Sequence, residues 1–322
     1  QLARNVCELV PCGERVRFCG SGSEATLYLI RCCRGFTGRE KIIRVEGHFH
    51  GYHELIYIGG QPPREAWPEN RQRPYIESAG IPQQFADLVI PIPYNDEEAL
   101  RTALERHGRE TAALILEPVN FNSGGIKPQP GYLELVRKLT REAGVLLFFD
   151  EIQSSFKKSP GGAQHDFGIV PDVCTIGKSL GGELPLSAFC GRADVMECFM
   201  PTGKVQHSGT FNAHIMPVLA GIAFLEEVAT PGFYLRLQAL EKRFHDGLDR
   251  IIRDRDIAMV APRHGARFNR GARAAARPDQ RGRGGGPYEF ALALDGRVDY
   301  HIDNQARPRP CRLRQRSTWP AP

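Results

Sequence analysis

The stretch that most constrains the fold is residues 144–178, GVLLFFDEIQSSFKKSPGGAQHDFGIVPDVCTIGK. It holds two short apolar runs, residues 145–149 and 173–176, and the charged residues Asp150 and Lys178 stand at their carboxyl ends. Short apolar runs bounded by Gly and Pro are typical of parallel strands that are buried on both faces of a sheet. Ligands of such sheets bind at the carboxyl ends of the strands. We therefore expect Asp150 and Lys178 to face one crevice.

A lysine and an aspartate at one sheet edge suit a pyridoxal phosphate site. The lysine forms a Schiff base with the aldehyde, and the carboxylate keeps a proton on the pyridine nitrogen, which makes the ring an electron sink. Taken singly, each residue also has a structural explanation: Asp150 caps a loop or helix, and Lys178 is a solvated surface lysine. Their pairing at two strand ends favours the cofactor site.

The charge of the chain is unevenly spread along its 322 residues, whose formal net charge is +5. Residues 263–322 hold thirteen Arg, no Lys and five acidic residues, which leaves the preceding part slightly acidic. We therefore expect no nucleic-acid partner for the main body. The tail is rich in Arg, Pro and Gly and has little periodic apolar content, so we expect it to be disordered or an aberrant carboxyl end, although an Arg-rich tail can also bind nucleic acid.

The nine cysteines are odd in number, include no Cys-x-x-Cys pair and mostly stand in apolar contexts. This usage predicts reduced, buried thiols and a cytoplasmic location. No apolar run approaches the roughly 20 residues that span a bilayer, and no secretory signal is visible, so we expect no membrane partner. The sequence starts at Gln1 rather than Met, and we expect it to be a fragment.

A candidate phosphate-binding turn runs from Gly20 to Ala25, between a predicted strand at residues 15–19 and a predicted helix that ends near Phe36. Ser21 and Glu24 form a capping box, and the free amides of a helix start bind phosphate. The same Gly-x-Gly-x-x-Ala pattern also fits a dinucleotide fingerprint, with Glu46 as the ribose ligand. A P-loop at Gly177-Lys178-Ser179 is excluded, because position 172, which must be Gly, is Asp.

Three histidines, His48, His50 and His53, raise a metal hypothesis. No helix places this spacing on one face, and no cysteine or carboxylate cluster completes a tetrahedral set, so we expect no metal here. An aromatic-His-Gly turn beside a planar cofactor explains the segment better, with Phe49 as a stacking face.

The remaining pattern alternates strands and helices. We expect strands at residues 41–45, 111–116 and 187–190, and helices ending near residue 9 and at 95–107 with Asn95 as cap, 132–143, 214–228 and 233–253. This order predicts an α/β fold with a mostly parallel central sheet flanked by helices. We expect a cofactor-binding large domain at residues 1–230, a helix leading into a small domain at 231–262, and the tail at 263–322.

Several of these blocks resemble, in order and spacing, the class III (fold type I) aminotransferases, most closely the glutamate-1-semialdehyde 2,1-aminomutase branch. The blocks are Cys-Gly-Ser-Gly-Ser-Glu-Ala-Thr at 19–26, Phe-His-Gly at 49–51, Glu-Pro-Val at 117–119, Asn122, Phe-Asp-Glu-Ile at 149–152, Gly-Gly-Ala-Gln at 161–164, Ile-Gly-Lys at 176–178 and Gly-Thr at 209–210. The resemblance covers residues from about 9 to 228. The segment Gln-Ser-Ser-Phe-Lys at 153–157 differs from the Met-Thr-Gly-Phe-Arg of the aminomutases, and the family's terminal small-domain parts are truncated or aberrant here.

The resemblance implies roles for single residues. Lys178 is the Schiff-base lysine and proton shuttle, and Asp150 is the partner of the pyridinium nitrogen. Gly22 and Ser23 hold the phosphate, Phe49 and Ile152 enclose the ring, and His50, Asn122 and Glu117 line the cofactor and substrate sides. The family implies an obligate homodimer in which Thr210 reaches the partner's phosphate, and small amino acid, keto acid or amino-aldehyde substrates. Burial and cationic neighbours would lower the pKa of the lysine for this chemistry.

Three functions remain open from the sequence. The first is amino-group transfer with pyridoxal 5'-phosphate, as a transaminase or as an aminomutase. The second is a non-catalytic remnant of the same fold. The third is a nicotinamide-dependent oxidoreductase built on residues 20–25, which leaves Asp150, Lys178 and Thr210 unexplained.

Overall fold

The computed structural model describes residues 1–63, 66, 73–255, 259–260, 264 and 272–273. All of them belong to one compact unit, Gln1–Ala274. The predicted tail at 263–322 lies almost entirely outside the described residues, and the division at residues 230 and 262 stays a prediction.

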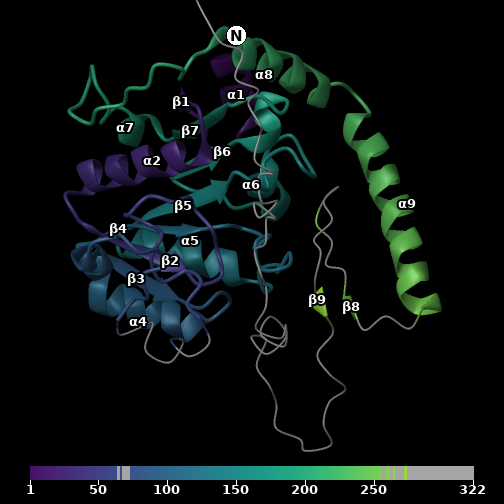
Figure 1. Cartoon of the computed structure of the whole chain (residues 1–322). Coiled ribbons are helices and arrows are strands. Elements are labelled where there is room, and N and C mark those ends of the chain that lie inside the picture. The colour runs from purple at the N-terminus through teal and green to yellow at the C-terminus, as the bar shows by residue number, and fades with distance from the viewer. Residues whose placement is uncertain (64–65, 67–72, 256–258, 261–263, 265–271, 274–322) are drawn as a thin grey trace, which may run out of the picture. The chain divides into compact units, whose positions relative to one another are not determined.

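A seven-stranded sheet forms the centre of this unit, in the order β1-β7-β6-β5-β4-β2-β3 (Figure 1). The strands are β1 Arg15–Cys19, β2 Lys41–Val45, β3 Val89–Ile92, β4 Thr111–Leu116, β5 Leu146–Glu151, β6 Val173–Ile176 and β7 Ser187–Gly191. Strands β6, β5, β4, β2 and β3 pair in parallel, and β7 pairs antiparallel with both β6 and β1. The expected α/β fold with a mostly parallel sheet is confirmed, with β7 as the reversed strand.

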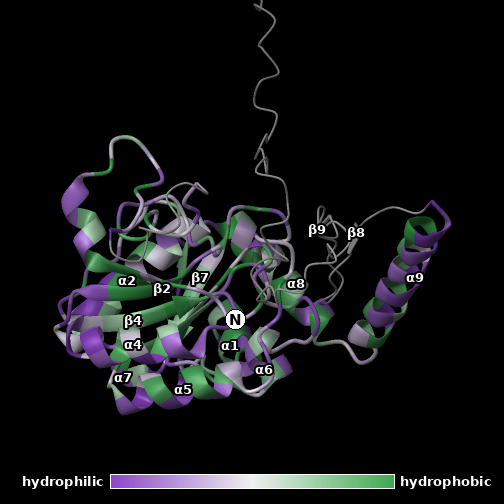
Figure 2. Cartoon of the chain, turned by 90° about the horizontal axis from the view of Figure 1, so that it is seen from below, coloured by the Kyte–Doolittle hydropathy of each residue, from purple (hydrophilic) through white to green (hydrophobic). Residues whose placement is uncertain are grey.

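Helices cover both faces of the sheet. The helices are α1 Leu2–Leu9, α2 Gly22–Thr37, α4 Glu97–His107, α5 Tyr132–Glu142, α6 Gly162–Phe167, α7 Ala193–Met196, α8 Ile215–Val228 and α9 Phe233–Asp254. Residues of α2 and α7 pack in the apolar core on one face, and residues of α1, α4, α5 and α8 pack in the core on the other. The central strands are buried on both faces, so β4 and β5 consist of buried residues throughout. Figure 2 shows the resulting pattern of apolar strands beneath amphipathic helices.

A capping side chain marks the start of three of these eight helices, α2, α4 and α8. Ser21 caps α2 and accepts a hydrogen bond from the amide of Glu24, as the capping box predicts, and the Glu24 carboxylate accepts from the hydroxyl of Ser21. The predicted cap of α4 is wrong by one residue. Asp96 caps this helix, and Asn95 instead takes a positive φ of 63° and holds the loop at Lys127 and Gln129 through its side chain.

Several short elements were not predicted: β3, α6, α7 and the turns of 3₁₀ helix Gln83–Leu88, Gly108–Glu110 and Lys178–Gly181. A further short pair, β8 Met259–Val260 with β9 Ala272–Arg273, is antiparallel. Within the described ranges no single helix is long and apolar enough to cross a bilayer; α8 and α9 pass such a test only as a pair, by length and composition, across a bend of 84°.

Candidate active site

Asp150 and Lys178 line one small pocket at the carboxyl ends of β5 and β6. Asp150 lies within β5 opposite Thr175 of β6, and Lys178 begins the 3₁₀ turn two residues after β6 ends. The pocket has a volume of about 180 Å³. Its lining residues come from five separate segments: Ser21, Gly22, Ser23, Phe49, His50, Gly51, Asp150, Ile152, Gln153, Lys178 and Ser187. The structure therefore places Asp150 and Lys178 at one crevice, as the sequence predicts.

Hydrogen bonds to both carboxylate oxygens fix the orientation of Asp150, which is buried. Oδ1 accepts from Thr175 Oγ1 at 2.9 Å and from the amide of Ile152 at 3.1 Å. Oδ2 lies 2.7 Å from Nδ1 of His50. Burial lowers the pKa of His50 even though the Asp150 carboxylate opposes this effect. The ring is therefore neutral at pH 7, and we assign its proton to Nδ1, which donates to Asp150.

The turn with Phe49, His50 and Gly51 is tied to the start of α2. Thr26 of α2 donates from Oγ1 to the carbonyl of His50 at 2.6 Å. Gly51 has a φ of +108°, and a Cβ there would lie 2.9 Å from the Cα of Ser23. This close approach places the aromatic-His-Gly turn directly beside the first turn of the helix, whose amide groups have no partners within the helix.

Glu117 supports the same turn from behind. Its Oε1 accepts from the amide of Phe49 at 2.8 Å and from Asn122 Nδ2 at 2.7 Å, and Gln153 Nε2 donates to Asn122 Oδ1 at 2.9 Å. Burial, followed by the nearby Asp150 carboxylate, raises the pKa of Glu117 to about 8. Glu117 and Asn122 line neither this pocket nor the larger cavity described next, so they reach the site through Phe49 and Gln153.

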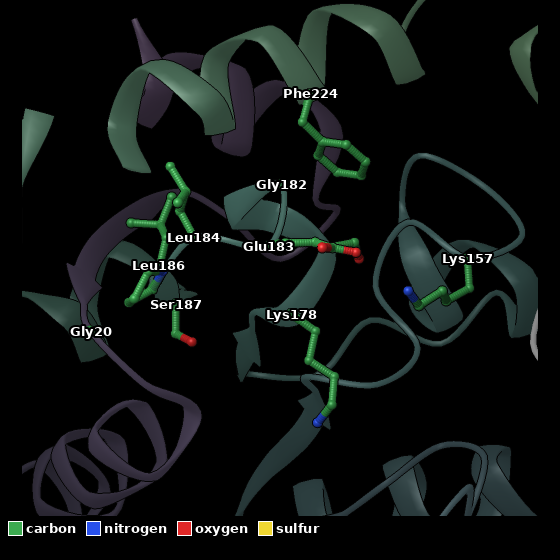
Figure 3. A pocket seen from close by; sticks show the side chains of 11 residues that line it. Gly20, Lys157, Lys178, Gly182, Glu183, Leu184, Leu186, Ser187 and Phe224 are labelled. Atoms are coloured by element: carbon green, nitrogen blue, oxygen red, sulfur yellow. The ribbon is translucent and has the colours of Figure 1, made fainter. Parts of the chain in front are cut away.

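A larger cavity of about 650 Å³ adjoins the pocket, and Lys178 and Ser187 line both spaces. Figure 3 shows Lys157, Glu183 and Phe224 approaching this cavity from three segments. Lys178 and Glu183 have positive φ angles of 48° and 73°. Such strained backbone in residues other than Gly is common at functional sites. Lys178 is exposed, so the burial that was expected for this lysine is not found.

The structure thus brings together seven of the nine predicted cofactor residues: Gly22, Ser23, Phe49, His50, Asp150, Ile152 and Lys178. Thr210 lies apart from them, exposed in a neighbouring cavity that is also lined by Gly20 and Ser21. Sequence reasoning missed Thr175 and Ser187. The strand alternation could have found Thr175, because it pairs directly with Asp150.

The arrangement does not fit the dinucleotide alternative. A dinucleotide fingerprint requires its glycine turn to leave a parallel strand inside the sheet, next to the following strand of a βαβ unit. Here the turn leaves β1, which lies at the sheet edge, pairs antiparallel with β7 and is not a neighbour of β2.

Comparison with known proteins identifies the family. Residues 1–267 match the family described as Aminotransferase class-III. The chain belongs to the class-III aminotransferases. Among curated members, it is 38% identical over 267 residues to the glutamate-1-semialdehyde 2,1-aminomutase of Methanobrevibacter smithii, covering 83% of this chain and 61% of that protein. It is 43% identical over 229 residues to the enzyme of that name from Methanocaldococcus jannaschii, covering 70% and 52%.

A solved transaminase structure shares the fold. An omega-transaminase from Sphaerobacter thermophilus superposes with a TM-score of 0.74 at 32% identity, over 82% of this chain and 60% of that one. The expected transferase fold is therefore confirmed. The chain spans between about half and three fifths of the length of the curated relatives it matches.

Proposed function

We propose that this class-III aminotransferase chain binds pyridoxal 5'-phosphate and moves an amino group, either between a donor and a keto acid or aldehyde or within one molecule as an aminomutase. The observation that carries the proposal is the single pocket shared by Lys178, Asp150 and the start of α2. The names of the relatives, aminomutases and transaminases, support the same chemistry.

The pocket residues fit this cofactor. Gly22 leaves space at the helix start, since a Cβ there would lie 3.2 Å from Ile152 Cδ1. The amides of Gly22 and Ser23 would hold the phosphate, and Phe49 and Ile152 would enclose the ring. The Asp150 carboxylate, whose position is fixed by three donors, would face the ring nitrogen.

The cofactor supplies an electron sink for the carbon that carries the amino group. Asp150 would hold a proton at the ring nitrogen, and His50 and Thr175 would keep its carboxylate in place. Lys178 would bind the aldehyde carbon through Nζ, and the same atom would then move protons on the substrate side. Its place at the border of both cavities supports this second role.

The larger cavity suits a small substrate with a carboxylate. Lys157 provides a cation and Phe224 an apolar wall, and both line the space next to Lys178. Contact of Glu117 with the substrate stays a prediction, because this side chain is buried behind Phe49.

We also propose a homodimer in which Thr210 contributes to the partner's site. Thr210 is exposed, and large apolar side chains near it are exposed as well: Phe211, Ile215, Met216 and Leu219. Sedimentation of the chain should give a dimer, and Leu219→Asp should shift it to monomer. The eight described cysteines are all free thiols, which supports the proposed cytoplasmic location.

Borohydride reduction in the presence of pyridoxal 5'-phosphate tests the site. Peptide mapping should find the pyridoxyl label on Lys178, and Lys178→Ala should remove it. Lys157→Ala is the matched control, since Lys157 lines the same cavity and its loss should leave the label in place. Label on Lys157 in the unchanged chain, or no label at all, would refute the assignment.

Two reactions separate the candidate activities. Glutamate 1-semialdehyde without an added amino acceptor should yield 5-aminolevulinate if the chain is a mutase. Turnover that depends on pyruvate, with no such product, indicates a transaminase. Label on Lys178 without either turnover would assign cofactor binding alone.

A further inference from the structure

Three thiols meet on the face of the sheet opposite the proposed cofactor pocket. Cys174 of β6 pairs in register with Cys190 of β7, and their sulfurs are 3.4 Å apart. Cys12, in the connection between α1 and β1, completes the group, and all three sulfurs lie within 4.8 Å of one another. These side chains are at most 3% exposed. They pack with the core of α1, α5 and α8, whereas Asp150 and Thr175 point to the other face.

The size of the sulfur triangle suits a metal ion. With sides of at most 4.8 Å, an ion equidistant from the three sulfurs would lie no more than about 2.8 Å from each. Shifts of a few tenths of an ångström would bring these distances to the roughly 2.3 Å of a metal–thiolate bond. Within the described part of the chain, no histidine, carboxylate or further cysteine joins the cluster as a fourth ligand.

The number and type of the ligands indicate which ion the site would bind. Soft thiolates favour Cu(I) and Zn(II), but structural zinc sites almost always have four ligands. We propose that Cys12, Cys174 and Cys190 form a three-sulfur binding site for Cu(I). Binding requires no oxidant or reductant, because the ion enters and remains as Cu(I). Each thiol that becomes a thiolate releases its proton to solvent.

Gln164 lies beside Cys12 and can hold it in place from outside the three-sulfur group. Its Oε1 accepts from the amide of Cys12 at 3.0 Å, which fixes the residue next to the cluster. Its Nε2 is buried and makes no hydrogen bond of good geometry to any described residue. An amide N–H in this position can donate to a thiolate sulfur and so stabilise the loaded site.

Anaerobic titration of the reduced full chain with Cu(I), in competition with a colorimetric Cu(I) chelator, tests the site. We expect one tightly bound equivalent, and at least a 100-fold loss of affinity in Cys12→Ala, Cys174→Ala and Cys190→Ala. Cys33→Ala is the matched control, since Cys33 is also a free and fully buried thiol. X-ray absorption of the loaded chain should show three sulfur neighbours.

Two further measurements separate a loss of Cu(I) binding from a loss of folding and from a loss of the proposed cofactor site. Cys12→Ser changes only the connection, so it should keep the far-UV circular dichroism spectrum of the unchanged chain while losing the rise in melting temperature that Cu(I) causes. The amount of pyridoxyl label on Lys178 should be equal in Cys12→Ser and in the unchanged chain. Equal Cu(I) affinity in the unchanged chain and in the variant lacking all three cysteines would overturn the proposal, as would Zn(II) binding more tightly than Cu(I).

Discussion

Nδ1 of His50 lies 2.7 Å from Oδ2 of Asp150, and both side chains are buried at the floor of the candidate cofactor pocket. This contact joins β5 to the turn that follows β2. The carbonyl of His50 is held by Thr26 of α2. One residue therefore couples the carboxylate that would face the cofactor ring to the helix start that would hold its phosphate.

Removing this imidazole should weaken cofactor binding. A hydrogen bond to a charged group contributes about 1.5–3 kcal/mol, so His50→Ala should raise the Kd for pyridoxal 5'-phosphate roughly 10- to 100-fold. His50→Asn can restore a donor and should lose less affinity. The measurement is an absorbance titration, with the exposed His165 changed to Ala as a control. Equal affinities for His50→Ala and the unchanged chain would show that the contact does not position Asp150.

Glu117 should make the stability of the folded chain depend on pH. Its pKa is raised from 4.5 to about 8, so the folded state binds more protons than the unfolded state between these values. The contribution of Glu117 to the free energy of unfolding is therefore greatest below about pH 4.5. It falls by at most about 5 kcal/mol as the pH rises toward 8. Glu117→Gln should flatten this fall, as measured by urea unfolding at several pH values without added cofactor.

The control for this prediction is the exposed Glu105→Gln, which should keep the slope of the unchanged chain. Part of the slope should also remain in Glu117→Gln, because burial raises the pKa of Glu151 to about 7. A lower free energy of unfolding for Glu117→Gln than for the unchanged chain at pH 8 would contradict the predicted sign. It would mean that the folded state ionises this carboxylate at little cost.

The sequence was sufficient to predict the central part of the fold because local and long-range signals agree there. Apolar runs with charged ends predicted β5, β6 and the meeting of Asp150 with Lys178. The Ser21 and Glu24 pair predicted the start of α2, and the same residues form the cap.

Other features depended on information that no local pattern contains. Strand β3 includes Pro91, which is tolerated because this strand lies at the sheet edge. The reversal of β7 follows from the short connection after β6, since parallel strands need a crossover of a dozen or more residues. The cluster of Cys12 with Cys174 and Cys190 joins residues more than 150 positions apart, so spacing could not show it.

Gly51 should be irreplaceable for steric reasons. Its φ is +108°, and a Cβ would meet Ser23 at 2.7 Å from Oγ and 2.9 Å from Cα. Gly51→Ala should destabilise the fold by roughly 2–4 kcal/mol through backbone strain and overpacking, and it should move Ser23 at the phosphate end of the pocket. Gly80→Ala is the matched control, because Gly80 has a φ of +95° with open space around it. Equal melting temperatures of the two variants would show that the helix start yields without cost.

Arg44 should be the main support of the segment that carries Phe49 and His50. This guanidinium is 2% exposed and donates to the carbonyls of His48, Ile56 and Ile58. Lysine keeps the charge but lacks the planar fork, so Arg44→Lys should lose two of these bonds and roughly 3 kcal/mol of unfolding free energy.

The test of Arg44 compares it with another arginine that binds several carbonyls. Arg39 donates to the carbonyls of Gly108, Thr111, Ala143 and Gly144, but it is only half-buried and lies away from the pocket. Because solvent can replace the lost bonds there, Arg39→Lys should cost less stability and leave cofactor affinity unchanged, whereas Arg44→Lys should lower both. Urea unfolding and absorbance titration measure the two effects. Unchanged cofactor affinity in Arg44→Lys would mean that the Phe49 and His50 turn holds its shape through Thr26 and Glu117 alone.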